Sequence, residues 1–119
     1  MPVPVFLSSS VLSGTAVSAA IEEFVAKGVT HVEWSGGHHY MELESTEEVL
    51  VRAFETLTSR LHNYFPPPKT DFVLNLASAD NEIASMSIEH VQKALEICGA
   101  LGAKKYGVHA GFLFDPNPE

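Results

Sequence analysis

The sequence alternates short apolar, β-branched segments with amphipathic segments of helical spacing, and this alternation constrains the fold more than any other feature. Each expected strand except the last is followed by an expected helix. The expected strands cover 3–7, 29–34, 57–62 and 106–109, and the expected helices run from about 15 to 27, 46 to 54 and 87 to 101. This βαβαβαβ order predicts an α/β fold with a parallel sheet and right-handed crossovers. A barrel and a doubly wound sheet both satisfy it.

Local signals set the expected helix boundaries. Thr15 is expected to cap the first helix, and Ser45 with Glu48 matches a capping box that begins the second helix near residue 46. Gly28 and Gly102 supply the left-handed residues that commonly end a helix. The third helix is expected to bury an apolar stripe of helical spacing. The stripe consists of Ile88, Val91, Leu95 and Cys98, with Ala94, Ile97 and Leu101 beside it.

Composition limits the partners and the compartment. Asp and Glu outnumber Lys and Arg by 15 to 7, which gives a net charge of -8. This charge argues against a broad nucleic-acid interface, although a few clustered basic residues would still bind a small anion. The single cysteine, Cys98, allows no intramolecular disulfide and suits a cytoplasmic protein. No apolar run approaches the roughly 20 residues of a membrane span, so we expect no membrane partner.

Three chemically active side chains lie at the ends of expected strands: Glu33, His62 and His109. Functional groups gather at the carboxyl ends of parallel strands. Two imidazoles at two strand ends would converge on one metal ion in a barrel. The alternatives are a His62 that is hydrogen-bonded within its own loop, and a Glu33 carboxylate that is paired with Arg60 or Lys105. The adjacent loop residues His38 and His39 are expected to be solvated rather than metal-bound.

Several longer stretches resemble a known family. They are Val-Glu-Trp-Ser-Gly-Gly at 32–37, His-Asn-Tyr-Phe-Pro-Pro-Pro at 62–68, Phe-Val-Leu-Asn-Leu-Ala-Ser at 72–78 and Leu-Gly-Ala-Lys-Lys-Tyr-Gly-Val-His-Ala-Gly-Phe at 101–112. The chain resembles the sugar-phosphate isomerase/epimerase family of the xylose isomerase-like TIM barrel superfamily, which includes endonuclease IV-type enzymes. The resemblance covers nearly the whole chain but only the amino-terminal half of the family's barrel. It implies one partial TIM-barrel domain over residues 1–119, a parallel half-barrel of about four strands.

The resemblance also implies a divalent metal, Zn, Mn or Mg, at the carboxyl face. In the endonuclease branch, histidines at the third and fourth strand ends bind zinc, and these places correspond to His62 and His109. In the epimerase branch, the main ligands and the acid–base glutamates come from strands five to eight, outside the resemblance. Within this chain we expect Glu33 to be catalytic and Asn63 and Tyr64 to contact the substrate.

The first functional hypothesis is the amino-terminal part of a metal-dependent isomerase or epimerase that acts on a small carbohydrate or sugar phosphate. The metal would polarise a sugar carbonyl and stabilise an enediolate, while carboxylates move the proton. Without strands five to eight, we expect little or no turnover from the chain alone. One alternative is a fragment of an endonuclease IV-like zinc phosphodiesterase. The other is a non-catalytic half-barrel that associates with itself through uncovered strand edges and apolar helix faces.

Overall fold

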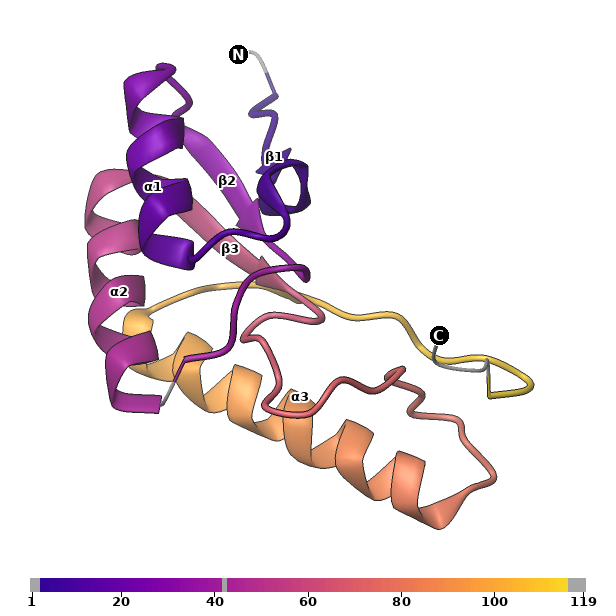
Figure 1. The fold of residues 1–119 in the computed structure, drawn as a ribbon. Helices are drawn as coiled ribbons and strands as arrows, with labels where there is room; N and C mark the ends of the chain where they lie inside the picture. Colours follow the sequence, from indigo (N-terminus) through magenta and orange to yellow (C-terminus); the bar gives the residue numbers. More distant parts are fainter. Residues whose placement is uncertain (1–2, 42, 116–119) are drawn as a thin grey trace.

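The sheet contains four parallel strands in the order of the chain. The computed structural model describes residues 3–41 and 43–115. Its strands β1 (Leu7–Ser8), β2 (His31–Trp34), β3 (Thr58–His62) and β4 (Tyr106–Gly107) pair in the order β1-β2-β3-β4. Figure 1 labels the first three of them. All three pairings are parallel. A doubly wound sheet reverses its strand order at a switch point, whereas a barrel adds its strands sequentially. The predicted α/β fold with a parallel half-barrel of four strands is therefore confirmed.

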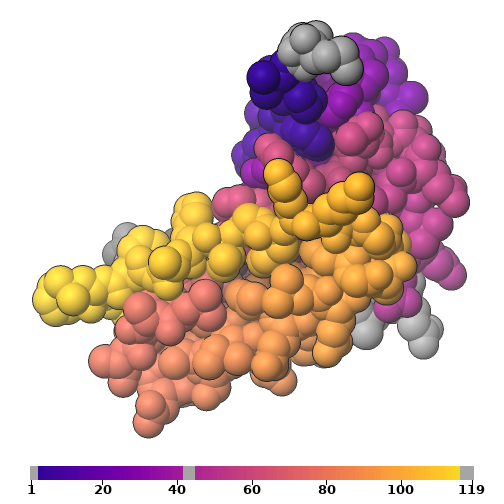
Figure 2. All heavy atoms as spheres, turned by 180° about the vertical axis from the view of Figure 1, so that it is seen from behind, coloured from indigo at the N-terminus to yellow at the C-terminus, as the bar shows by residue number. Residues whose placement is uncertain are grey.

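The two edge strands are shorter than the sequence predicts. β1 begins at Leu7 instead of residue 3, and β4 ends at Gly107 instead of residue 109. Each edge strand has one neighbour, so fewer ladder hydrogen bonds extend it than extend the central pair. Beyond β4 the chain continues as an irregular segment, which is yellow in Figure 2. In that view it lies against the orange and salmon part of the chain that includes α3 (Asn81–Leu101).

The helices begin at different residues from those predicted. α1 (Val17–Ala26) has Ala16 as its N-cap residue, without a side-chain hydrogen bond, whereas the Thr15 hydroxyl donates to the Leu12 carbonyl at 2.6 Å. The Thr15 cap was therefore wrong. α2 (Leu43–Thr56) begins three residues before residue 46, so Ser45 lies inside the helix and the predicted capping box was also wrong. Both errors share a cause, because a hydroxyl near a helix start has several backbone partners within reach.

α3 begins six residues before the predicted start. Asp80 caps it, and its carboxylate accepts from the backbone N–H groups of Glu82 and Ile83. Gly102, with φ of 70°, ends the helix as predicted. α3 is the longest helix described, yet no helix in the described ranges has the length and apolar character needed to cross a bilayer.

The buried face of α3 is rotated from the predicted stripe. Ile88 and Leu95 are 48% and 52% exposed, so two of the four predicted stripe positions lie on the outside of the helix, while Cys98 is buried as predicted. The buried positions are Ser87, His90, Ala94, Ile97 and Cys98. An α-helix in the outer layer of a barrel has a neighbour on each side. Apolar spacing does not distinguish the side that faces α2 from the opposite side, which explains the error.

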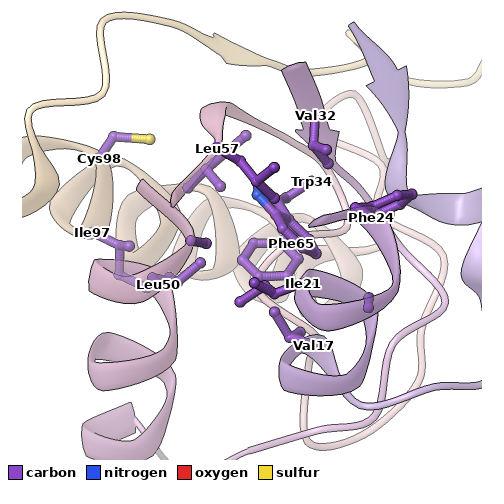
Figure 3. Packing of buried hydrophobic residues seen from close by; sticks show 13 residues of the cluster. Val17, Ile21, Phe24, Val32, Trp34, Leu50, Leu57, Phe65, Ile97 and Cys98 are labelled. Carbon is purple, nitrogen blue, oxygen red and sulfur yellow. The ribbon is translucent and has the colours of Figure 1, made fainter. Parts of the chain in front are cut away.

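The core lies between the sheet and its helices. Val32 and Trp34 alternate with the half-buried His31 and Glu33 along β2, which separates a covered face of the sheet from an open one. On the covered face the Trp34 ring lies 6.0 Å from both the Phe24 and the Phe65 rings (Figure 3). The open face carries His31 and Glu33 of β2 and Arg60 and His62 of β3, and these lead to the candidate site.

Candidate functional site

The two histidines selected from the sequence meet at the carboxyl ends of β3 and β4. His62 is the last residue of β3 and pairs in register with Gly107, two residues before His109. The centroids of the His62 and His109 rings lie 5.1 Å apart, with 78° between the ring planes. His62 is half-buried and His109 is exposed, so the pair opens to solvent. Residues 47 positions apart in the sequence thus form one cluster at the rim.

The hydrogen bond of His62 determines which ring nitrogen can act as a ligand. His62 Nδ1 lies 2.6 Å from the Asn63 carbonyl oxygen. Because a carbonyl oxygen only accepts, Nδ1 carries the proton, and Nε2 of the neutral ring keeps its lone pair. Metal-binding histidines are commonly oriented by such a bond from the non-ligating nitrogen to a backbone carbonyl. The predicted alternative of a loop hydrogen bond therefore coexists with an Nε2 that forms no hydrogen bond within residues 3–41 and 43–115.

Gly107 makes room for the His62 ring. A Cβ atom at position 107 would lie 2.5 Å from His62 Cδ2, closer than two carbon atoms approach. Every other residue type at this strand position would displace the imidazole. The sequence interpretation did not include Gly107, although a glycine inside a strand often marks close approach of a neighbouring group.

Asn63 lies beneath the pair and positions His109. Its side chain is 5% exposed, and Oδ1 accepts from the His109 backbone N–H at 3.1 Å. Its own backbone N–H donates to the Gly107 carbonyl at 2.9 Å. Asn63 was predicted as a substrate contact. This stays a prediction. The observed bonds use Oδ1 to join the β3 and β4 ends, which gives Asn63 a positioning role.

Glu33 lies on the open face of the sheet and is ion-paired. Its register partner on β3 is Arg60, and Arg60 Nε lies 2.8 Å from Glu33 Oε2. The Arg60 guanidinium also lies over the Phe6 ring, 4.0 Å from its centroid. Since Arg60 and His62 are two residues apart on one strand, both point to the same face. The pairing alternative for Glu33 is thus observed, and its catalytic role stays a prediction.

Tyr64 borders a hollow between the β2–α2 and β3–α3 loops. The hollow measures about 580 Å³, and its lining includes Gly36, His39, Tyr64 and Asp71. The Tyr64 hydroxyl accepts from the Leu74 N–H at 2.7 Å, which fixes the ring at the edge of this space. A substrate contact by Tyr64 stays a prediction, and the ring has a position that allows it.

His38 is buried, so the expected solvation of both loop histidines was wrong for this residue. His38 is 7% exposed, whereas His39 is exposed. Nδ1 lies 3.2 Å from the Thr15 carbonyl and therefore carries the proton, and Nε2 lies 2.8 Å from Ser9 Oγ. Burial lowers the pKa of His38 from 6.5 and outweighs the hydrogen bonds, which act in the opposite direction. The Ser9 hydroxyl also accepts from the Ser35 N–H, so this cluster ties the ends of β1 and β2 together.

A buried asparagine holds the segment after His109. Asn75 is fully buried, and its Oδ1 accepts from the N–H groups of Ala77 and Phe112. Its Nδ2 donates to the Phe112 carbonyl and to Asp115 Oδ1. These bonds fasten the C-terminal segment to the β3–α3 loop, and the sequence interpretation missed them. The sequence Asn-Leu-Ala-Ser is typical of an ordinary loop, so the role of Asn75 becomes visible only through its distant partners.

The residues present fit a divalent metal as a partial ligand set. Two imidazoles suit Zn, and His62 is oriented with Nε2 pointing away from its hydrogen bond. In residues 3–41 and 43–115 no group of three or more His, Cys, Asp or Glu side chains is arranged to hold a metal ion. A catalytic zinc usually has three protein ligands and a water molecule. The pair would thus supply at most two ligands, and a complete site would need others.

The parallel sheet and its helices define the class of the chain, which is an α/β protein with a parallel half-barrel. No family model matches the chain, and no curated protein matches it. Among solved structures it is similar to the TTHB071 protein from Thermus thermophilus, determined after soaking with ZnCl2, with a TM-score of 0.62 and 20% sequence identity. The match covers 94% of this chain and 41% of that chain, so this chain spans about two fifths of its length. At this identity the similarity shows a shared fold.

Proposed function

We propose that this chain is the amino-terminal part of a metal-dependent sugar or sugar-phosphate isomerase/epimerase. The observation that carries the proposal is the approach of His62 and His109 at one rim of a parallel half-barrel. The resemblance of residues 62–68 and 101–112 to the family supports the choice of substrate class. The proposed partner is a small carbohydrate or sugar phosphate.

In the proposed site, the chain's own residues prepare the ligands. His62 and His109 would hold a divalent metal, Zn, Mn or Mg, whose contribution is Lewis-acid polarisation of a sugar carbonyl. The Asn63 carbonyl keeps the proton of His62 on Nδ1, and the Asn63 side chain fixes the backbone at His109. Glu33, oriented by Arg60, lies on the same face and would orient a sugar hydroxyl or carry a proton.

The test is an assay of aldose–ketose interconversion and of epimerisation with the complete translation product of the gene, with Mn or Zn added. We expect activity that chelation abolishes and that His62→Ala and His109→Ala reduce at least about 100-fold. We expect little turnover from the 119-residue chain alone. Absence of sugar chemistry in the metal-loaded product, or equal activity of both variants and the parent, would overturn the proposal.

A second candidate is a zinc phosphodiesterase of the endonuclease IV type. It is favoured by the positions of the two histidines, since His62 is the last residue of β3 and His109 follows β4. The net charge of -8 opposes it, because the field repels a phosphate backbone. Binding to duplex DNA with an abasic site, weakened by salt and lost in His109→Ala, would favour this candidate over the first.

A non-catalytic, self-associating half-barrel is the third candidate. β1 and β4 are the edges of the sheet, and Ile88 and Leu95 present apolar surface on α3. Sedimentation equilibrium distinguishes this state, because the mean mass would rise with concentration. Leu95→Lys would then shift the species toward monomer, and a strictly monomeric parent chain would rule the candidate out.

A further inference from the structure

A second hollow lies away from the histidine rim, in the layer of helices and loops. It measures about 320 Å³ and lies between the β2–α2 loop, the β3–α3 loop, α2 and α3. This volume is at the lower end of the range of small-molecule sites. The described lining contains no residue of the edge strands β1 and β4. The hollow is therefore formed without the open edges of the sheet.

The hollow combines an apolar interior with charged groups. Phe72, Met86 and Ile97 form apolar walls, together with the proline run at 66–68. Lys69 and Lys93 also line it, from the loop and from α3, and both are exposed. Neither ammonium forms an ion pair with a carboxylate among the described residues, although the chain carries a net charge of -8. Two cations without an ion pair in the described part of the chain, beside one apolar space, favour an anionic ligand with an apolar body.

The net charge of the lining indicates that the ligand is a monoanion. Glu89 is the acidic residue in the described lining, and it offsets one of the two lysines. His90 adds no charge at neutral pH, because burial and then the Lys93 ammonium lower its pKa. Over the described lining the remaining charge of about +1 matches one carboxylate better than a phosphate dianion, which would lie against Glu89.

We propose that this hollow binds a small apolar monocarboxylate, with its hydrocarbon body against Phe72 and Met86 and its carboxylate between Lys69 and Lys93. The site is separate from the histidine pair and does not depend on the proposed metal chemistry. Its proposed ligand differs from a sugar, because Phe72, Met86, Ile97 and the proline run make much of the lining apolar.

The methionines provide the readout. Of the three methionines in the sequence, Met41 and Met86 line the hollow. The full chain, labelled with 13C at the methionine methyl groups, is titrated with 3-phenylpropionate and, separately, with the uncharged 3-phenylpropanamide. We expect the Met41 and Met86 signals to move along one saturable curve, and the acid to bind roughly tenfold more tightly than the amide.

Substitutions separate the charge from the apolar walls. Lys69→Gln and Lys93→Gln should each weaken binding of 3-phenylpropionate about threefold, because both side chains are solvated. Lys27→Gln is the matched control, since Lys27 is paired with Glu23 on α1 and should leave affinity unchanged. Met86→Trp should fill the space and abolish saturable binding. Equal affinity for acid and amide, no saturable shift in the parent, or equal weakening by Lys27→Gln would overturn the proposal.

Discussion

The two faces of the sheet differ in what they bury. On the covered face, Val32, Trp34 and Leu61 are fully or almost fully buried against the helices. On the open face, Glu33 and His62 are half-buried polar groups that bond to other polar groups. The covered face therefore provides most of the hydrophobic stabilisation, whereas the open face holds charged and imidazole side chains in place.

This difference indicates a division between stability and chemistry. A half-barrel has a helix-covered exterior like that of a whole barrel, but its interior surface lacks opposing strands. Changes on the covered face should thus affect folding strongly and metal binding only indirectly. Changes on the open face should affect the site with small effects on folding.

The largest effect should come from Phe65→Ala. Phe65 is fully buried and packs on Trp34, so the change removes apolar contacts and leaves a cavity. We expect the free energy of unfolding to fall by about 3–5 kcal/mol, measured by urea denaturation. His31→Ala on the open face is the comparison, with an expected loss of about 1 kcal/mol or less. Similar losses for the two variants would contradict the division.

Gly107→Ala should have the next largest effect and should alter the site directly. The added Cβ meets the His62 ring, so the ring must move or the β3–β4 pairing must distort. We expect a loss of about 1–3 kcal/mol and weaker zinc binding, measured by urea denaturation and calorimetric titration.

Gly99→Ala is the matched control for Gly107→Ala. Gly99 lies in α3, and a Cβ there would meet nothing within 4 Å. Alanine should stabilise the helix by roughly 0.5–1 kcal/mol and leave metal affinity unchanged. If Gly107→Ala binds zinc as the parent does, the close fit between Gly107 and His62 has no functional role.

Stability should fall as the pH drops below 6.5. Burial lowers the pKa of both His38 and His90 from 6.5, and for His90 the Lys93 ammonium adds to this effect. The unfolded chain then takes up protons at a higher pH than the folded chain does. The stabilisation from burying these two neutral imidazoles is complete above pH 6.5. It decreases as the pH falls below 6.5 toward the lowered pKa values of the folded state.

Urea midpoints measured between about pH 7.5 and 5.5 test this dependence. They should decrease across the range, and His90→Phe should reduce the slope because it removes one of the two titrating groups. A midpoint that stays constant or rises on acidification would contradict the assigned burial of these histidines.

Glu33→Gln should have the smallest effect on stability. The Glu33 and Arg60 side chains are 27% and 39% exposed, so water screens their ion pair. We expect a loss of about 0.2–1 kcal/mol by urea denaturation. A loss like that of Phe65→Ala would show that the open face is structural. If the role proposed for Glu33 is correct, the same substitution should greatly reduce sugar turnover in the complete gene product.

The alternation of strands and helices could be predicted from sequence because it depends on local periodicity. The strand order could not, since both a barrel and a doubly wound sheet satisfy the same alternation. The convergence of His62 and His109 followed from placing both at carboxyl ends of parallel strands. Their support by Gly107 and Asn63 could not be predicted, because it depends on contacts between β3 and β4.

Errors occurred where one local pattern suits two environments. A hydroxyl such as that of Thr15 can either donate to a nearby carbonyl or cap a helix, and the backbone path decides which of the two bonds forms. The apolar positions of α3 cover more than one side, so their spacing did not show that Ile88 and Leu95 lie outside. Buried polar groups such as His38 and Asn75 resembled ordinary loop residues, because their partners are distant in the sequence.

The most direct measurement is a zinc titration of the 15N-labelled chain, followed by the imidazole signals of its six histidines. If His62 and His109 form one metal site, their signals will shift together with a common midpoint, and Nε2 of His62 will show the change at the ligating nitrogen. The signals of His31, toward the amino end of β2, will stay in place. Different midpoints for His62 and His109, or equal shifts across all exposed histidines, would show that the two rings lie close together without sharing a metal.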